Sequence, residues 1–380
     1  MNPQPMKPAP PRRILVRGVN WLGDAVMSTP ALLRLRELFP DAHIAMLTPA
    51  KLQDLWKKHP AINQTIAFGP DRSLWSVASQ IRSVGPAGES FDLAIVLPGS
   101  PRSALETFLA RIPRRIGYGG LWRNLFLTDP IPRRTGHIRI RKLSRTEVRE
   151  LVNNANSRPK RPEWNLGAHQ VHDYLHLVGY LGANPQPLPP RLFIDAEDLE
   201  SAKGRFGLAG NARPVVAMVP GAEYGPAKQW PAERFTAAAR EIQQRIDCAW
   251  IILGVAGDAG IASGMESALR SAGLRIQNLA GQTSLAELCA LLKLSRVVLS
   301  NDTGAMHAAA ALGTRVVVPF GSTSPELTGP GLPGDTTHRL LKSDAPCSPC
   351  FRRTCPIDFR CMNGIGIDEV VKAALEILKS

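Results

Sequence analysis

Short runs of consecutive apolar residues recur along the chain, and longer segments with apolar residues at helical spacing separate them. Continuous apolar runs, in contrast to strict alternation with polar residues, are typical of parallel strands covered on both faces. The repeated order of strand and helix predicts an α/β protein with two doubly wound parallel sheets, one in each half. The runs lie at residues 14–17, 43–47, 65–68 and 93–97, and at 215–219, 249–253, 296–299 and 314–323.

The length of 380 residues is typical of two domains, each able to bury a core of its own. Residues 183–191 are dense in proline and are the best linker candidate, so we expect an N-terminal domain at 12–182 and a C-terminal domain at 192–380. Residues 1–11 are Pro-rich and polar, which predicts a disordered tail and not a signal peptide. Residues 120–168 interrupt the pattern and are interpreted as an insertion.

Several helix ends are marked by their residues. A helix is expected to begin near Asp24 and to kink or restart at Pro30, because proline lacks the N–H that a helix interior uses. Pro231 suits the first turn of another helix, where that N–H is not needed. Ser284 and Glu287 form a capping-box pattern before a further helix. One more helix is expected at residues 169–181.

The net charge of +14 indicates an anionic partner, and the cations are concentrated in one part of the chain. A nucleic-acid protein would interleave aromatic residues with such charge, but residues 133–149 contain no aromatic side chain except His137. We therefore favour an anionic acceptor or lipid headgroup surface over a merely solvated segment, and no nucleic acid. No apolar run approaches the roughly 20 residues that span a bilayer, so a cytoplasmic protein is expected. The cations are Arg111, Arg114, Arg115, Arg123, Arg133, Arg134, His137, Arg139, Arg141, Lys142, Arg145 and Arg149.

Small polar residues follow the apolar run at 296–299 and lead into a helix. A strand that ends this way presents backbone N–H groups at a positive helix terminus, which is a phosphate-binding arrangement. Asp302, Thr303 and Gly304 form this turn, although an ordinary helix cap would have the same composition. His307 lies one turn into the helix, where a packed histidine and a ligand-binding histidine are both compatible with the sequence.

Three further candidates follow other predicted strands. Asp24, preceded by Gly23, could act as a general base or could simply cap a helix. Lys228 lies just before a helix start, where a cation is unfavourable unless an anion is bound, although most single lysines are solvated. Asp258 could accept hydrogen bonds from ribose hydroxyls. The chain has no Asp-x-Asp pair, which favours neutralising a diphosphate with Lys228 and helix N-termini over a divalent metal.

Four of the six cysteines lie within 15 positions near the C-terminus. In a cytosolic chain this pattern favours a metal clip over disulfides, but zinc sites commonly have two short Cys-x-x-Cys pairs and only one is present here. We expect reduced thiols that pack the C-terminal segment, with structural zinc as the less favoured alternative. Cys248 and Cys289 are expected to be buried thiols. The four clustered cysteines are Cys347, Cys350, Cys355 and Cys361.

The chain resembles the bacterial heptosyltransferases of lipopolysaccharide core synthesis, glycosyltransferase family 9. The resemblance rests on residues 20–32, 220–231, 301–309 and the cysteine segment 347–362, and it extends from about Arg13 to the C-terminal helix. It implies a GT-B fold, in which two Rossmann-like domains face each other across a central cleft. The Pro-rich tail and the basic insertion depart from the family.

The resemblance also implies an inverting, metal-independent transfer without a cofactor. L-glycero-D-manno-heptose would move from ADP-heptose to the first heptose of the inner core on a phosphorylated Kdo-lipid A acceptor. Asp24 would be the base, with Gly23 beside it, and Lys228 would contact the donor. Asp302 would hold the heptose, Thr303 and Gly304 the diphosphate, and Asp258 the ribose, while His307 matches the motif without a defined role.

A protein with this function would lie at the inner face of the cytoplasmic membrane, with its N-terminal domain binding the acidic core oligosaccharide. Two alternatives stay open from the sequence. One is a family 9 heptosyltransferase that adds a different heptose, and the other is a non-catalytic nucleotide-sugar binder. The presence of Asp24, Lys228 and Asp302 together argues against the second alternative, because a binder needs no base.

Overall fold

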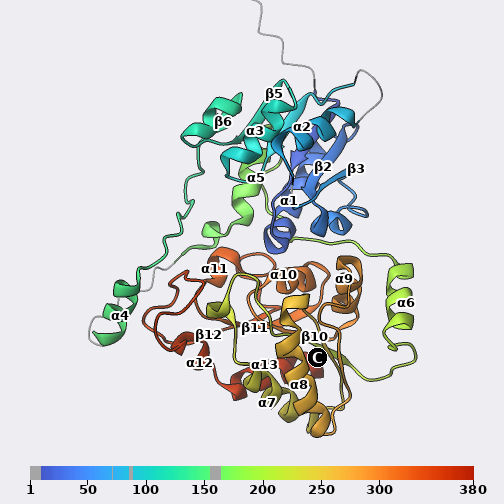
Figure 1. Cartoon of the computed structure of the whole chain (residues 1–380), viewed down its shortest axis with the longest axis vertical. Coiled ribbons are helices and arrows are strands. Elements are labelled where there is room, and N and C mark those ends of the chain that lie inside the picture. The colour runs from blue at the N-terminus through green and yellow to red at the C-terminus, as the bar shows by residue number, and fades with distance from the viewer. Residues whose placement is uncertain (1–9, 71, 85–88, 155–163) are drawn as a thin grey trace, which may run out of the picture. The chain divides into compact units, whose positions relative to one another are not determined.

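The computed structural model describes residues 10–70, 72–84, 89–154 and 164–380 (Figure 1). The chain divides into two compact units. Unit 1 comprises residues 1–135 and 171–187, and unit 2 comprises residues 136–170 and 188–380. Residues 136–170 thus group with unit 2 although they lie between two segments of unit 1, and the domain boundaries expected from the sequence stay a prediction. Most of the expected N-terminal tail lies outside the described residues.

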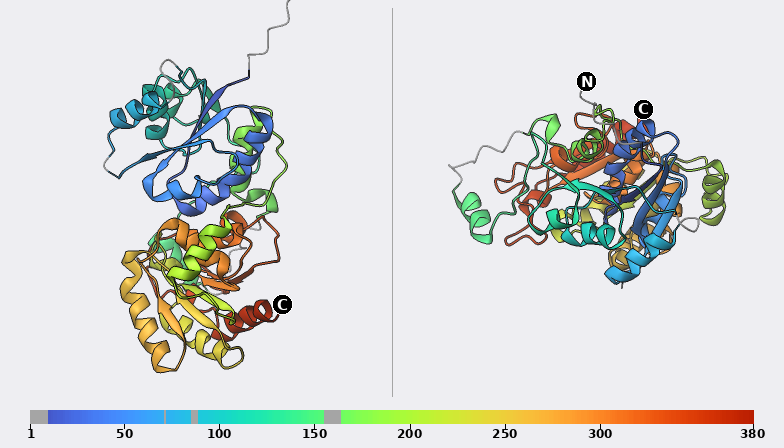
Figure 2. Two further views of the ribbon diagram at one scale, coloured as in Figure 1. Left: turned by 90° about the vertical axis from the view of Figure 1, so that its right-hand side faces the viewer. Right: turned by 90° about the horizontal axis from the view of Figure 1, so that it is seen from above.

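Unit 1 is built on a parallel six-stranded sheet in the order β3-β2-β1-β4-β5-β6. Helices lie on both sides of the sheet (Figure 2), which is why the central strands β1 and β4 are almost fully buried. The strands are β1 (Arg13–Arg17), β2 (His43–Pro49), β3 (Gln64–Phe68), β4 (Leu93–Val96), β5 (Arg114–Tyr118) and β6 (Asp129–Ile131). The helices are α1 (Leu22–Leu38), α2 (Leu74–Ser83), α3 (Pro101–Leu109) and α5 (Val171–Gly179), with short 3-10 turns η1 (Ala50–Leu55) and η2 (Trp122–Phe126).

Unit 2 repeats this plan with a parallel sheet in the order β12-β11-β10-β7-β8-β9. Its strands are β7 (Val215–Val219), β8 (Ala249–Ile252), β9 (Ile276–Asn278), β10 (Val297–Ser300), β11 (Arg315–Phe320) and β12 (Arg339–Lys342). Its helices are α4 (Arg145–Asn153), α6 (Ala196–Arg205), α7 (Ala232–Gln243), α8 (Ala259–Ser271), α9 (Leu285–Leu294), α10 (Gly304–Ala311), α11 (Pro325–Thr328), α12 (Arg360–Asn363) and α13 (Ile367–Lys379). The 3-10 turns are η3 (Leu166–Ala168), η4 (Pro226–Lys228) and η5 (Ala256–Asp258).

All eight strands expected from the apolar runs are present, so the α/β class with one doubly wound sheet in each half is confirmed. The runs did not reveal β5, β6, β9 and β12. Strand β5 begins with two arginines, and β6, β9 and β12 are short strands at or near the sheet edges. Because β6 joins the first sheet, the expected insertion at residues 120–168 is wrong for its first part.

Helix α1 begins at Leu22, two residues before the expected start, and continues past Pro30 without restarting. The reason is local. Pro30 cannot donate to the carbonyl of Val26, and the Thr29 hydroxyl donates to that carbonyl instead at 2.8 Å. The expected capping box at Ser284 is present at α9. Among the described residues, no helix combines the length and the apolar character needed to cross a bilayer.

Candidate active site

Four polar residues follow four adjacent strands of the unit 2 sheet. Thr323 follows β11, Asp302 follows β10, Lys228 follows β7 and Asp258 follows β8, and these strands are neighbours in this order. The carboxyl ends of parallel strands meet at one edge of the sheet, which is where α/β proteins bind ligands. This edge of unit 2 is therefore the candidate site.

A buried ion pair lies at the centre of this edge. Lys228 Nζ is 2.5 Å from Asp302 Oδ2, and the two side chains are 13% and 4% exposed. The Thr323 hydroxyl donates to the same carboxylate oxygen at 2.5 Å. The cation that the sequence placed at an unfavourable helix start is thus paired inside the protein, and the carboxylate of Asp302 is held in one orientation.

The loop that carries Lys228 is fixed at both ends by Asn301. Its Nδ2 donates to the Pro220 carbonyl at 2.6 Å, and its Oδ1 accepts from the Trp230 N–H at 2.9 Å. Asn301 is fully buried. Because Asn301 directly precedes Asp302 in the chain, it sets the position of the lysine relative to the carboxylate.

The same loop contacts the cysteine segment near the C-terminus. Gly225 adopts φ of +143°, and a Cβ there would lie 2.6 Å from the Arg353 carbonyl, which also accepts a bond from the Ala227 N–H at 3.0 Å. Two cations lie over the Tyr224 ring, with Lys228 Nζ 4.8 Å and the Arg353 guanidinium carbon 5.2 Å from the ring centroid. Burial raises the pKa of Tyr224, and its hydroxyl donates to the Phe351 carbonyl at 2.7 Å.

Helix α10 begins at this edge and points its N-terminus into the site. Thr303 is the N-cap residue, but its side chain makes no capping hydrogen bond, and both Thr303 and Gly304 are half-buried. The N–H groups of the first turn therefore lack the usual side-chain acceptor, as the predicted phosphate-binding arrangement requires. The neighbouring Asp302 would repel an anion, but the charge of Lys228 offsets that of the carboxylate.

His307 is buried in α10 and behaves as a packed histidine. Burial lowers its pKa to about 4, so the ring is neutral at neutral pH, although the nearby Asp302 acts in the opposite direction.

Asp258 occupies space that two glycines leave open. Its Oδ2 accepts from the Val255 N–H at 3.0 Å. A Cβ added at Gly221 would lie 2.2 Å from this oxygen, and one added at Gly254 would lie 2.8 Å from it. The glycines at the ends of β7 and β8 thus allow the carboxylate to sit over both strands.

Gly23 and Asp24 lie at the carboxyl end of β1 in unit 1, within the first turn of α1. Trp21 is the N-cap residue, so the alternative that Asp24 caps the helix is wrong. The preceding loop is held by Arg17, whose Nη1 donates to Asn20 Oδ1 at 3.1 Å and whose Nε donates to Glu106 at 2.8 Å. Both Arg17 and Glu106 are buried.

The structure thus brings Lys228, Asp302, Thr303 and Gly304 together in unit 2, with His307 packed behind them. Sequence reasoning missed Asn301, Thr323, Tyr224 and Arg353. For Thr323 a signal was present. It ends the expected strand run at 314–323, and the preceding expected run, 296–299, leads to Asp302. Tyr224 and Arg353 lie within the motif segments 220–231 and 347–362, but the sequence did not indicate that they meet, because they are 129 positions apart in the chain.

The six cysteines are free, and burial raises the pKa of Cys248, Cys347, Cys350 and Cys361. Burial raises the pKa of Cys347 to about 11 and that of Cys361 to about 12. Within the described part of the chain, no group of three or more His, Cys, Asp or Glu side chains is placed to hold a metal ion. The expectation of reduced thiols, with structural zinc as the less favoured alternative, stays a prediction.

Comparison with known proteins identifies the family. The model of glycosyltransferase family 9 (heptosyltransferase) matches residues 81–359. The chain belongs to glycosyltransferase family 9. Its resemblance to that family, read from the sequence motifs, is confirmed, and so is its assignment as a glycosyltransferase.

Relatives and solved structures agree with this family assignment. The chain is 30% identical to lipopolysaccharide heptosyltransferase 2 of Escherichia coli K12 over 84% of this chain and 85% of the relative. It is 31% identical to lipooligosaccharide heptosyltransferase 2 of Haemophilus ducreyi over 84% and 86%. The structure of E. coli ADP-heptose LPS heptosyltransferase II matches with a TM-score of 0.73 and 25% identity, covering 97% of this chain and 98% of that one. The GT-B class of two Rossmann-like units is therefore confirmed.

Proposed function

We propose that this protein is an inverting glycosyltransferase that moves L-glycero-D-manno-heptose from ADP-heptose to the first heptose of the lipopolysaccharide inner core. The observation that carries the proposal is the buried Lys228–Asp302 pair beside the first turn of α10, whose N-cap residue makes no side-chain capping hydrogen bond. It combines a fixed carboxylate for sugar hydroxyls with N–H groups for a diphosphate. The names of the relatives, heptosyltransferase 2, support heptose as the transferred sugar.

In the donor complex, the N–H groups at Thr303 and Gly304 would bind the diphosphate at the positive end of α10. Lys228 would contribute positive charge to the same group. Asp302, oriented by the Thr323 hydroxyl, would accept hydrogen bonds from the heptose. Asp258 would accept a hydrogen bond from the ribose. His307 would support α10 from behind as a neutral ring.

Asp24 would act as the general base. It would remove the proton of the acceptor hydroxyl while the oxygen attacks the anomeric carbon of heptose from the face opposite the leaving group. The bond from that carbon to the diphosphate oxygen breaks, ADP leaves with the electron pair, and the proton stays on Asp24. The growing charge on ADP is met by Lys228 and the α10 N–H groups, so charge stabilisation is built in before the reaction.

The acceptor would be phosphorylated Kdo-lipid A carrying one heptose, at the inner face of the cytoplasmic membrane. The net charge of +14 and the cationic side chains between residues 133 and 149 support an anionic acceptor. Nucleic acid is not proposed as a partner.

The test mixes purified protein with ADP-heptose and a core acceptor that carries one heptose, and it measures ADP release. Asp24→Ala is expected to lower turnover at least about a hundredfold, the usual minimum for a positioned base. Asp41→Ala, an exposed carboxylate just beyond the end of α1, is the matched control and should keep full turnover. Equal turnover in all three proteins would refute the role of Asp24.

Tight binding of ADP-heptose without ADP release would leave two alternatives, a heptosyltransferase for another position and a nucleotide-sugar binder. A panel of shorter core acceptors then decides between them. Turnover with a different acceptor would indicate a heptosyltransferase for another position. The absence of turnover with every acceptor would indicate a nucleotide-sugar binder.

A further inference from the structure

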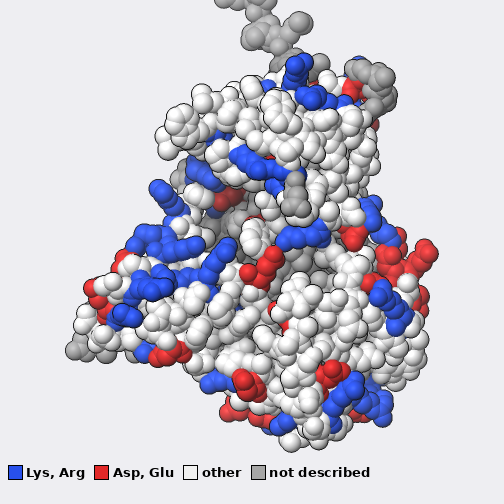
Figure 3. All heavy atoms as spheres, viewed as in Figure 1, with Lys and Arg blue, Asp and Glu red and all other residues white. Residues whose placement is uncertain are grey.

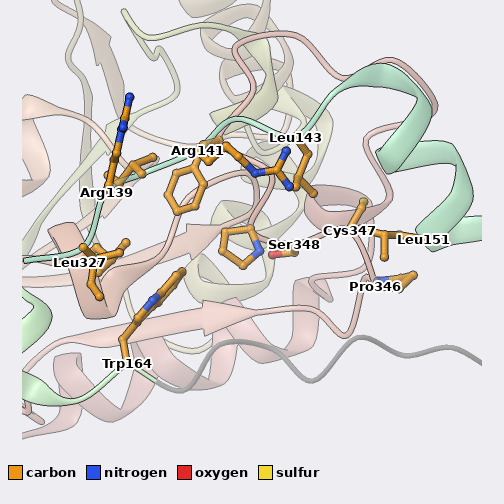
Figure 4. Close-up of a pocket in the computed structure, with 13 residues that line it drawn as sticks. Arg139, Arg141, Leu143, Leu151, Trp164, Leu327, Pro346, Cys347 and Ser348 are labelled. Carbon is orange, nitrogen blue, oxygen red and sulfur yellow. The ribbon is translucent and has the colours of Figure 1, made fainter.

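Unit 2 contains a pocket of about 340 Å³ that the proposed donor site does not use (Figure 4). Two segments far apart in the sequence form most of it, residues 138–151 and residues 346–351. Hydrogen bonds join these segments. The Leu143 N–H donates to the Cys350 carbonyl at 3.1 Å, and Arg352 Nη1 donates to the Leu143 carbonyl at 2.7 Å. The pocket walls are therefore fixed relative to each other.

The walls of the pocket are mainly apolar. The polar side chain of Ser348 in the lining already donates to the Gly321 carbonyl at 2.7 Å. A free sugar, which needs several hydrogen-bonding partners, would fit this lining poorly, whereas a hydrocarbon chain would fit it well. The larger apolar side chains are Ile138, Leu143, Leu151, Trp164, Leu327 and Phe351.

Cations lie at one side of this apolar lining. Figure 4 shows Arg139 and Arg141 on the opposite side of the pocket from Trp164. Arg141 Nη2 is 2.7 Å from Glu147, whereas Arg139 makes no ion pair within the part of the chain that the structure describes. Residues 139–150 carry five cationic side chains and two carboxylates, and Figure 3 shows Lys and Arg side chains gathered over this region.

An apolar side chain lies exposed among these cations. Ile140 lines the pocket between Arg139 and Arg141 and is 48% exposed. Leu166, in η3 of the same unit, is 63% exposed. Exposed apolar groups next to cations are typical of surfaces that bind the anionic, hydrocarbon-bearing components of a membrane.

We propose that this pocket binds the acylated, phosphorylated end of the glycolipid acceptor. A phosphate would pair with Arg139, and part of an acyl chain would lie along the apolar walls beside Ile140. This inference rests on the proposed function, and it assigns to unit 2 a part of acceptor binding separate from the catalytic hydroxyl. The occupant is the lipid A portion of the acceptor, because it combines phosphate and acyl chains in one molecule.

The experiment measures binding of the full chain to phosphatidylcholine vesicles that contain lipid A, by cosedimentation. Arg139→Glu removes one favourable charge and adds one unfavourable charge, which at about fivefold each predicts binding weakened about twenty-five-fold. Ile140→Ser removes apolar contact from a side chain already half exposed, and about fivefold weaker binding is expected. Arg275→Glu, an exposed arginine just before β9, changes net charge equally and should weaken binding less than about threefold.

Equal weakening by Arg139→Glu and Arg275→Glu, or wild-type binding by Ile140→Ser, would overturn the pocket. So would equal wild-type affinity for vesicles in which phosphatidylglycerol replaces lipid A at equal charge, because the charge alone would then explain binding. Because both variants alter exposed side chains, their folding is not expected to limit the measurement.

Transfer by the wild-type chain to a fully deacylated, water-soluble acceptor tests the proposed function separately. Transfer to that acceptor together with indiscriminate vesicle binding would refute the pocket and leave the function intact. Selective loss of lipid A binding in Arg139→Glu, without transfer to any acceptor, would refute the function and retain the lipid pocket.

Discussion

The ion pair between Lys228 and Asp302 makes a quantitative prediction about stability. Replacing Lys228 with Met removes the cation but keeps most of the apolar stem. The Asp302 carboxylate then stays buried, with the Thr323 hydroxyl still donating to it. An unpaired buried carboxylate is costly, so the variant should be clearly less stable than the wild type.

The structure sets the magnitude. At 2.5 Å and an effective dielectric constant of about 20, the attraction between the two charges is about 7 kcal/mol, and the cost of removing both from water offsets much of it. Removing one partner of a buried pair typically costs about 3–5 kcal/mol. Because Lys228 is 13% exposed, we expect the lower value, about 3 kcal/mol. For a unit of this size, that corresponds to a melting temperature lower by about 6–12 °C.

The assay is thermal unfolding followed by circular dichroism. Lys203→Met is the matched control, because Lys203 Nζ is 2.6 Å from Glu200 but the two side chains are 36% and 70% exposed. An exposed pair contributes about 0–1 kcal/mol, so a shift below about 4 °C is expected. Adding Asp302→Asn to Lys228→Met should restore most of the lost stability. The reasoning is refuted if the two single variants melt alike, or if the double variant is no more stable than Lys228→Met.

Three other variants or reagents test separate features of unit 2. Gly221→Ala places a Cβ 2.2 Å from the Asp258 carboxylate and should weaken ADP binding about tenfold by calorimetry, whereas Gly257→Ala has no neighbour within 4 Å and should bind normally. Burial lowers the pKa of His307 to about 4 in the folded protein, from about 6.5 in the unfolded chain. Between pH 6.5 and 4 the unfolded chain therefore binds more protons than the folded protein, and the stability of the wild type should fall as the pH decreases through that window. His307→Asn should show a smaller drop in melting temperature from pH 7 to pH 5, and an equal drop would contradict this. Burial raises the pKa of Cys361 to about 12, so mass spectrometry should find it unmodified by iodoacetamide at pH 8 until the chain is unfolded. If the four clustered cysteines are reduced thiols, as the sequence leads us to expect, protein purified without chelator should contain less than about a tenth of an equivalent of zinc.

The sequence predicted the fold well where burial dictates residue type. Strands such as β7 and β10 are covered on both faces, so every position must be apolar or small, and the run stands out. The apolar runs did not reveal strand β5, because Arg114 and Arg115 occupy its first two positions. Both residues are only half-buried, so charged side chains are tolerated there. Pro30 misled the helix prediction because its effect depends on whether another group replaces the missing donor, which Thr29 does here.

The candidate site was predictable to the extent that it follows from strand ends. Asp302, Lys228 and Asp258 each follow a recognisable strand, and parallel topology brings such positions to one edge. The pairing of Lys228 with Asp302 was not predictable, because it depends on the path of a loop that Asn301 fixes at both ends. The grouping of residues 136–170 with unit 2 also depends on contacts with a segment some 200 positions away, such as the bond from Leu143 to Cys350.

Base and donor site lie on the carboxyl edges of two different sheets, which separates donor binding from proton removal. All the groups proposed to bind ADP belong to unit 2, whereas Asp24 belongs to unit 1. Asp24→Ala should therefore abolish turnover while ADP affinity by calorimetry changes less than about twofold, and Lys228→Met should weaken ADP binding itself. A loss of ADP affinity in Asp24→Ala as large as that in Lys228→Met would mean that the carboxylate acts on the donor. Proton removal would then have to be assigned to a different residue.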